Sequence, residues 1–114
     1  MALDTNTYCR NNYVKVMPGH GNSVFRVCVR QDYMNVYASV GGLLTVNQMP
    51  ITLWLERYTN GKWNIISSAR FGIKDGQTIN HTFKNIAVKD AAMRVRVMID
   101  IQRDIYAYST QFWR

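Results

Sequence analysis

Apolar and polar residues alternate along most of this chain with a period of two. In residues 93–101 (MRVRVMIDI), every second residue from Met93 onward is apolar, and the residues between them include Arg94 and Arg96. This pattern is typical of a β-strand with one buried face and one solvated face. The same period recurs in residues 23–31, 34–40, 51–58, 63–69, 78–83 and 105–113.

Turn-forming residues lie between the alternating segments. They are Pro-Gly-His-Gly-Asn at 18–22, Gly-Gly at 41–42, Asn-Gly at 60–61, Lys-Asp-Gly at 74–76 and Lys-Asp at 89–90. No segment has the 3.6-residue period of an amphipathic helix. We therefore predict one domain over residues 1–114, an antiparallel β-sandwich of seven or eight short strands, with a small β-barrel as the alternative.

The Asn-Gly pair at 60–61 separates two apolar runs and predicts a hairpin whose register has two solutions. A two-residue loop pairs Tyr58 with Trp63 and leaves neither face apolar. A three-residue loop at 59–61 pairs Tyr58 with Lys62 and separates apolar from polar side chains better. We predict the three-residue loop, because a slip of one residue is costly when one face is buried.

This register has consequences for the side chains around the turn. Trp63 faces the core, whereas Trp54, Glu56 and Tyr58 face solvent. Lys62 then lies diagonally across from Glu56, which is the only glutamate of the chain. The hairpin is therefore interpreted as a fold-defining element whose outward aromatic residues suit binding better than Glu56 suits catalysis.

The net charge of the chain indicates which classes of partner its surface favours. There are 14 Lys and Arg residues against 7 Asp and Glu residues, which gives a net charge of +7 and a pI near 9.7. Such a surface favours nucleic acid, acidic envelope polymers or anionic lipid. No apolar run approaches the roughly 20 residues of a membrane-spanning helix, so no transmembrane span is expected.

Cys9 and Cys28 are the two cysteines of the chain. We predict a disulfide between them, which closes a loop of about 20 residues and contributes about 3 kcal/mol in the loop-entropy picture. A disulfide favours secretion, and the alternative is two thiols in a cytoplasmic protein. The paired-cysteine spacings of zinc and redox sites are absent, so we expect no metal and no cofactor.

Arginines and aromatic residues together form the candidate binding surface. If the strands that carry them are neighbours, two pairs of arginines create one positive stripe, and the tyrosines near the C-terminus lie beside it. Exposed aromatic rings next to arginines suit stacking on bases or sugars, or contact with a lipid interface. The predicted binding residues are Arg26, Arg30, Trp54, Tyr58, Arg94, Arg96, Tyr106 and Tyr108.

These features favour a small, basic, non-enzymatic binding protein that is secreted and engages an anionic surface, such as a cell envelope, polysaccharide or lipid. An antimicrobial, toxin-like or adhesive role fits this description. The alternative is a nucleic-acid-binding or capsid-like protein, because an arginine-rich face also neutralises phosphates. We expect a monomer or a homodimer that pairs through edge strands.

A small basic ribonuclease is the third hypothesis. It would use Glu56 as the general base, a histidine as the acid, and arginines to hold phosphate. His20 lies in a glycine-rich turn, and the alternation around His81 predicts that its side chain faces outward. We therefore predict no catalytic residues.

Overall fold

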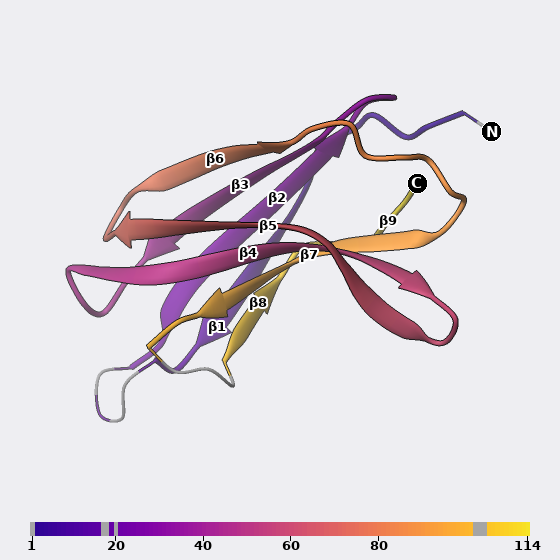
Figure 1. The fold of residues 1–114 in the computed structure, drawn as a ribbon. Coiled ribbons are helices and arrows are strands. Elements are labelled where there is room, and N and C mark those ends of the chain that lie inside the picture. The colour runs from indigo at the N-terminus through magenta and orange to yellow at the C-terminus, as the bar shows by residue number, and fades with distance from the viewer. Residues whose placement is uncertain (1, 17–18, 20, 102–104) are drawn as a thin grey trace.

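The fold is built from two antiparallel β-sheets that pack face to face (Figure 1). The computed structural model describes residues 2–16, 19, 21–101 and 105–114. The four-stranded sheet has the order β1 (Tyr8–Val14), β2 (Ser23–Gln31), β3 (Val36–Leu43) and β6 (Thr78–Phe83). The five-stranded sheet has the order β5 (Lys62–Lys74), β4 (Gln48–Thr59), β7 (Ala92–Ile99) and β8 (Tyr106–Tyr108), with β9 (Phe112–Trp113) also paired to β7. The predicted sandwich is confirmed, and the sheets do not close into a barrel.

The alternating pattern produces the core directly. On β2, Phe25, Val27 and Val29 face inward, and on β7 every second residue from Met93 to Ile99 does the same. These side chains are almost completely buried between the sheets. Their removal from water is the main favourable contribution to folding.

Strand β1 is not among the predicted strands, because the polar residues 10–12 break its alternation. It lies at the edge of its sheet and pairs only with β2. The Asn12 side chain completes its attachment. Its Nδ2 donates to the Tyr108 carbonyl at 2.9 Å, and its Oδ1 accepts from the Tyr108 N–H at 3.0 Å. This amide therefore joins the two sheets at one edge.

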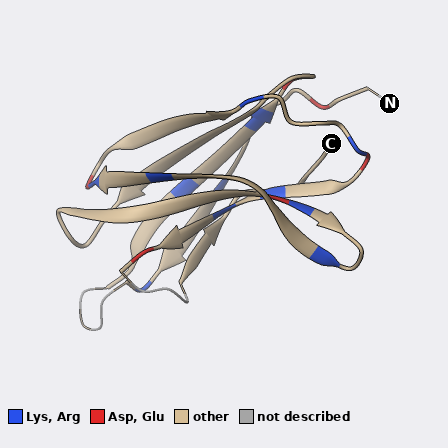
Figure 2. Ribbon diagram, viewed as in Figure 1, with Lys and Arg blue, Asp and Glu red and all other residues tan. Residues whose placement is uncertain are grey.

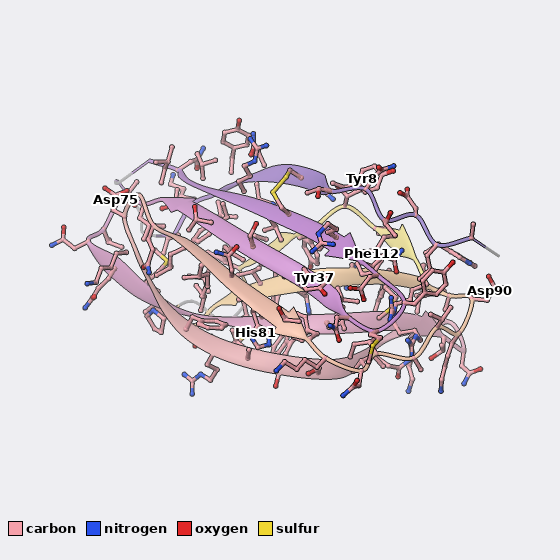
Figure 3. All side chains as sticks on the ribbon, turned by 90° about the horizontal axis from the view of Figure 1, so that it is seen from above. Tyr8, Tyr37, Asp75, His81, Asp90 and Phe112 are labelled. Carbon is pink, nitrogen blue, oxygen red and sulfur yellow. A yellow bond between two sulfur atoms is a disulfide. The ribbon has the colours of Figure 1, made fainter. Side chains whose placement is uncertain are left out.

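The Cys9–Cys28 disulfide is present and crosses between directly opposed residues of β1 and β2. It lies on the outer face of the four-stranded sheet, and Figure 3 shows it as a yellow bond. The predicted pairing is confirmed, and the bond is consistent with an extracellular protein.

Two sequence signals near strand ends gave wrong predictions. Gly41 and Gly42 lie inside β3 and not in a turn. A Cβ on Gly42 would come within 3.0 Å of the Ile73 side chain, so glycine permits close packing of the two sheets here. Residues 105–113 are not one strand, because the buried Ser109 Oγ accepts the Val95 N–H at 2.8 Å and the pairing with β7 breaks at this point.

The β4–β5 turn also differs from the prediction. Asn60 and Gly61 have positive φ angles of 54° and 78°, and Thr59 pairs with Lys62 across a two-residue loop. Both central residues therefore have the left-handed conformation of a type I′ turn. The three-residue loop is wrong, and Trp63 faces outward.

A β-bulge explains why the two-residue loop is compatible with a buried core. Glu56 pairs with Ile65 but Leu55 pairs with Ser67, so Ile66 is an extra residue in β5. Such an insertion changes the face on which the following residues of the strand lie. The tip of this hairpin extends past the other strands in Figure 1.

Two arginines are buried at the end of the sandwich that holds the C-terminal residues. Arg57 donates to the Ala87 carbonyl, and Arg114 donates to the carbonyls of Ile86 and Asp32. Burial lowers the pKa of both guanidinium groups. Arg114 is fully buried, and its hydrogen bonds join the β2–β3 connection at Asp32 to the β6–β7 connection at Ile86.

Candidate functional site: the aromatic–arginine face

The outer face of the five-stranded sheet collects arginine and aromatic side chains from four strands. Arg94 and Arg96 alternate with buried residues on β7, so both point outward. Arg94 lies opposite Glu56, and Arg96 lies opposite Trp54 on one side and Tyr108 on the other. We call this surface the aromatic–arginine face, and it comprises Trp54, Glu56, Trp63, Arg94, Arg96, Tyr106 and Tyr108.

Glu56 joins the two arginines. Its Oε1 accepts from Arg94 Nε at 2.8 Å, and its Oε2 lies 2.9 Å from Arg96 Nη2. Glu56 is only 1% exposed. Among the described residues it is the only acidic residue within a strand, and the other described acidic residues lie outside the strands (Figure 2). The carboxylate therefore offsets the repulsion between two like charges on the same strand face.

Each arginine is also stacked between one tryptophan and one tyrosine. The Arg94 Cζ lies 4.2 Å from the Trp63 ring centroid and 4.7 Å from that of Tyr108. The Arg96 Cζ lies 4.4 Å from Trp54 and 4.8 Å from Tyr106. These distances are well inside the range of about 6 Å for cation–π attraction. Each of the four rings therefore has one face occupied by a guanidinium group.

This arrangement orients two guanidinium groups in advance of any ligand. The side chains of Arg94 and Arg96 are 18% and 20% exposed. Arg94 uses its Nε for Glu56, and its two Nη groups have no hydrogen-bond partner among the described residues. A planar fork of N–H groups matches the oxygens of a carboxylate or a phosphate. The face can therefore bind an anion with little loss of side-chain entropy.

The structure brings together five of the predicted binding residues and places the others elsewhere. Trp54, Arg94, Arg96, Tyr106 and Tyr108 belong to the face. Tyr58 lies beside it, with its ring 5.2 Å from that of Trp63 in an edge-to-face contact.

The expected single stripe of four arginines does not form. Arg26 and Arg30 lie on β2, in the other sheet, and point outward on the opposite side of the sandwich. There Arg30 stacks on the Tyr37 ring, with its Cζ 4.1 Å from the centroid. The alternation predicted that all four side chains point outward, but it did not specify which strands are neighbours.

Trp63 and the ion pairs of Glu56 were missed. The sequence signal that indicates them is the Asn-Gly pair at 60–61, because its preferred two-residue turn places Trp63 on the same face as Glu56. The expected pairing of Glu56 with Lys62 is wrong, and Arg94 and Arg96 take that place.

Two residues of the ribonuclease hypothesis, Glu56 and His81, are not brought together. His81 faces inward between the sheets, where its ring lies 4.6 Å from Phe83 and 5.5 Å from Phe71 (Figure 3). The predicted outward orientation is wrong, and burial lowers the pKa of His81. Glu56 lies on the outer face of the other sheet. His20 lies outside the described residues.

Within residues 2–16, 19, 21–101 and 105–114, His, Cys, Asp and Glu form no group of three that could hold a metal ion. The same residues contain no helix long and apolar enough to cross a membrane. Comparisons with protein-family models, curated proteins and solved structures found no match to this chain. The functional proposal therefore rests on geometry and charge.

Proposed function

We propose that this protein is a small extracellular, non-enzymatic binding module that engages an anionic surface through the aromatic–arginine face. The observation that supports this most strongly is that Arg94 and Arg96 are each held by Glu56 and by two aromatic rings. The surfaces proposed are a cell envelope, an acidic polysaccharide or an anionic lipid layer. An antimicrobial, toxin-like or adhesive role is the biological form proposed for such binding.

Charge acts at two ranges in this proposal. The net charge of +7 draws the protein towards an anionic surface from a distance. At contact, the two Nη groups of Arg94 bind an anionic group in a bidentate manner, and Nη1 of Arg96 provides a further donor. The exposed Arg70, whose side chain is 75% accessible, lies on the same sheet, but its charge is offset by the ion pair with Asp100.

Nucleic-acid binding is the alternative, and the stacking geometry makes it the weaker one. Sequence-tolerant binding of single strands depends on open aromatic faces on which bases stack. Trp54, Trp63, Tyr106 and Tyr108 each give one ring face to a guanidinium group. The rings therefore hold the arginines and are less available as stacking platforms.

Co-sedimentation with vesicles tests the proposal. Vesicles that contain phosphatidylglycerol should bind the protein, and vesicles of phosphatidylcholine alone should not. Alginate beads provide a second anionic surface that separates polysaccharide binding from lipid binding. Binding should weaken strongly at about 0.5 M salt, because the Debye length then falls to a few ångströms. Absence of binding to both anionic surfaces at low salt would overturn the proposal.

Matched variants test the location of the site. The triple variant Glu56→Gln/Arg94→Gln/Arg96→Gln removes the whole charged cluster and leaves no orphan charge in the sheet. It lowers the net charge by one, as does Lys74→Gln, whose exposed side chain lies at the end of β5. The triple variant should lose binding to the phosphatidylglycerol vesicles, and Lys74→Gln should retain it. An equal loss of binding in both variants would indicate that net charge alone drives binding. Tighter binding of a single-stranded oligonucleotide than of either surface would favour the nucleic-acid alternative.

A further inference from the structure

A hollow lies on the outer face of the four-stranded sheet, on the side of the sandwich opposite the aromatic–arginine face. Its volume is about 460 Å³, which lies within the usual range of small-ligand sites. Its lining includes Asn11, Tyr13, Arg26, Gly41, Leu43 and Thr78. Because these residues belong to the other sheet, the hollow is separate from the aromatic–arginine face.

Gly41 creates the floor of the hollow. Asn11, Arg26, Gly41 and Thr78 form one row across β1, β2, β3 and β6, and glycine is the only member without a side chain. A Cβ at Gly41 would lie 3.2 Å from Thr78 Oγ1, so even a small side chain would begin to fill the space.

The neighbouring row forms a wall at one end of the hollow. Tyr13, Val24 and Leu43 are aligned across β1, β2 and β3. Tyr13 is 68% exposed and Leu43 is 64% exposed, so both side chains project from the sheet. An exposed tyrosine ring beside a shallow polar floor presents an apolar surface that can pack against a flat ligand.

The polar groups of the hollow favour an anion with hydroxyl groups. Arg26 is exposed and has no ion pair or hydrogen bond to another described residue. The side chains of Asn11 and Thr78 likewise have no hydrogen-bond partner in the described part of the chain, and no acidic residue is among those that line the hollow. The site therefore offers a cation, an amide and a hydroxyl around an open aromatic ring.

We infer that this hollow binds an acidic sugar residue, a pyranose that carries a carboxylate, within a polysaccharide. Arg26 pairs with the carboxylate, because the guanidinium fork matches its two oxygens. Asn11 and Thr78 bind ring hydroxyls, and the Tyr13 ring packs against the sugar. This site is distinct from the proposed anionic-surface site and does not depend on it.

Titration of the ¹⁵N-labelled protein with trigalacturonate at about 150 mM salt tests the inference. The backbone N–H signals of Asn11, Arg26, Gly41 and Thr78 should shift and saturate. Maltotriose has the sugar rings without the carboxylates, and tricarballylate has carboxylates without the rings. Both should bind at least about tenfold more weakly. Equal binding of either control ligand, or shifts confined to other residues, would overturn the inference.

Gly41→Val tests the hollow itself. The φ angle of Gly41 is not positive and valine suits a strand, so this substitution should fill the floor once the Thr78 side chain, 3.2 Å from the added Cβ, shifts slightly. Circular dichroism checks that the variant is folded before the titration. Gly72→Val is the control, because a Cβ there meets no atom within 4 Å and Gly72 lies in the other sheet. We expect at least about a tenfold loss of affinity for trigalacturonate in Gly41→Val alone.

Arg26→Gln provides a test that does not alter packing. It should weaken trigalacturonate binding at least about tenfold, whereas Arg10→Gln, an exposed arginine on β1 outside the hollow, should not. Full affinity in Arg26→Gln or in folded Gly41→Val would contradict the site. The triple variant at Glu56, Arg94 and Arg96 should retain trigalacturonate binding, so the two proposals fail separately.

Discussion

Replacing Glu56 by glutamine removes the one negative charge that joins Arg94 and Arg96. The glutamine keeps the shape of the side chain, but it presents an NH₂ group where the second carboxylate oxygen was. One of the two arginines then faces another donor, and two like charges remain close together on β7. The folded state should therefore be destabilised without any change in core packing.

The size of the effect follows from burial. Removing one partner of a buried ion pair costs about 3–5 kcal/mol. Glu56 is almost completely buried, but the arginine side chains are 18% and 20% exposed, so water compensates part of the loss. We expect a loss of about 2–3 kcal/mol. At about 2.1 cal/mol/K for each of the 114 residues, the unfolding entropy is about 0.24 kcal/mol/K, so Tm should fall by about 8–12 °C.

Thermal unfolding followed by circular dichroism at neutral pH measures this change. Arg70→Gln is the control, because the Arg70 side chain is 75% exposed and its partner Asp100 keeps the hydrogen bond from Thr52 Oγ1. A pair with such an exposed arginine contributes at most about 1 kcal/mol, so this variant should lose no more than about 4 °C. If Glu56→Gln lowers Tm no more than Arg70→Gln does, the buried carboxylate does not have the stabilising role assigned to it.

Three further predictions concern the fold. The double variant Cys9→Ser/Cys28→Ser should have a free energy of unfolding about 3 kcal/mol lower, as measured by urea titration. An unchanged urea midpoint would contradict the stabilising role of the cross-link. Burial lowers the pKa of His81 below its usual value of 6.5, so the unfolded state binds more protons just below that pH. The contribution of His81 to stability should therefore be fully present above about pH 6.5 and should decrease as the pH falls below it, and His81→Phe should abolish this decrease. The urea midpoints of both proteins at two pH values measure the effect. The same change in midpoint in both proteins would count against the inward histidine. Gly61→Ala should cost about 1 kcal/mol because φ is 78° there, whereas Gly72→Ala should cost less; equal costs would argue against the type I′ turn.

The alternating pattern was sufficient to predict the sandwich and the buried faces of β2 and β7. Every second residue on these strands is apolar, and the period of a strand leaves only one way to bury that set. Strand β1 escaped prediction because residues 10–12 are polar on both faces, and Asn12 uses its amide to bond the backbone of β8. A polar strand held by side-chain hydrogen bonds has no period to detect.

The candidate site was predictable in part only, because two facts lie outside any local pattern. The two-residue turn pairs Trp63 with Tyr58, on the face away from Leu55, and the extra residue Ile66 then lets later residues of β5 such as Ile73 face the core. Alternation cannot reveal such a bulge in advance. The order of the strands then decides which outward residues meet. Arg96 meets Trp54 because β7 lies beside β4, whereas Arg26 belongs to the other sheet.

Oriented guanidinium groups, and not net charge alone, are proposed to bind the anionic surface. The double variant Arg94→Lys/Arg96→Lys keeps the net charge at +7 and leaves Glu56 with positive partners, but it removes the planar forks. Its affinity for phosphatidylglycerol vesicles, measured beside the unmodified protein in the same buffer, separates the two contributions. We expect a loss of about tenfold, which corresponds to about 0.7 kcal/mol for each arginine. Unchanged affinity would show that net charge alone is sufficient.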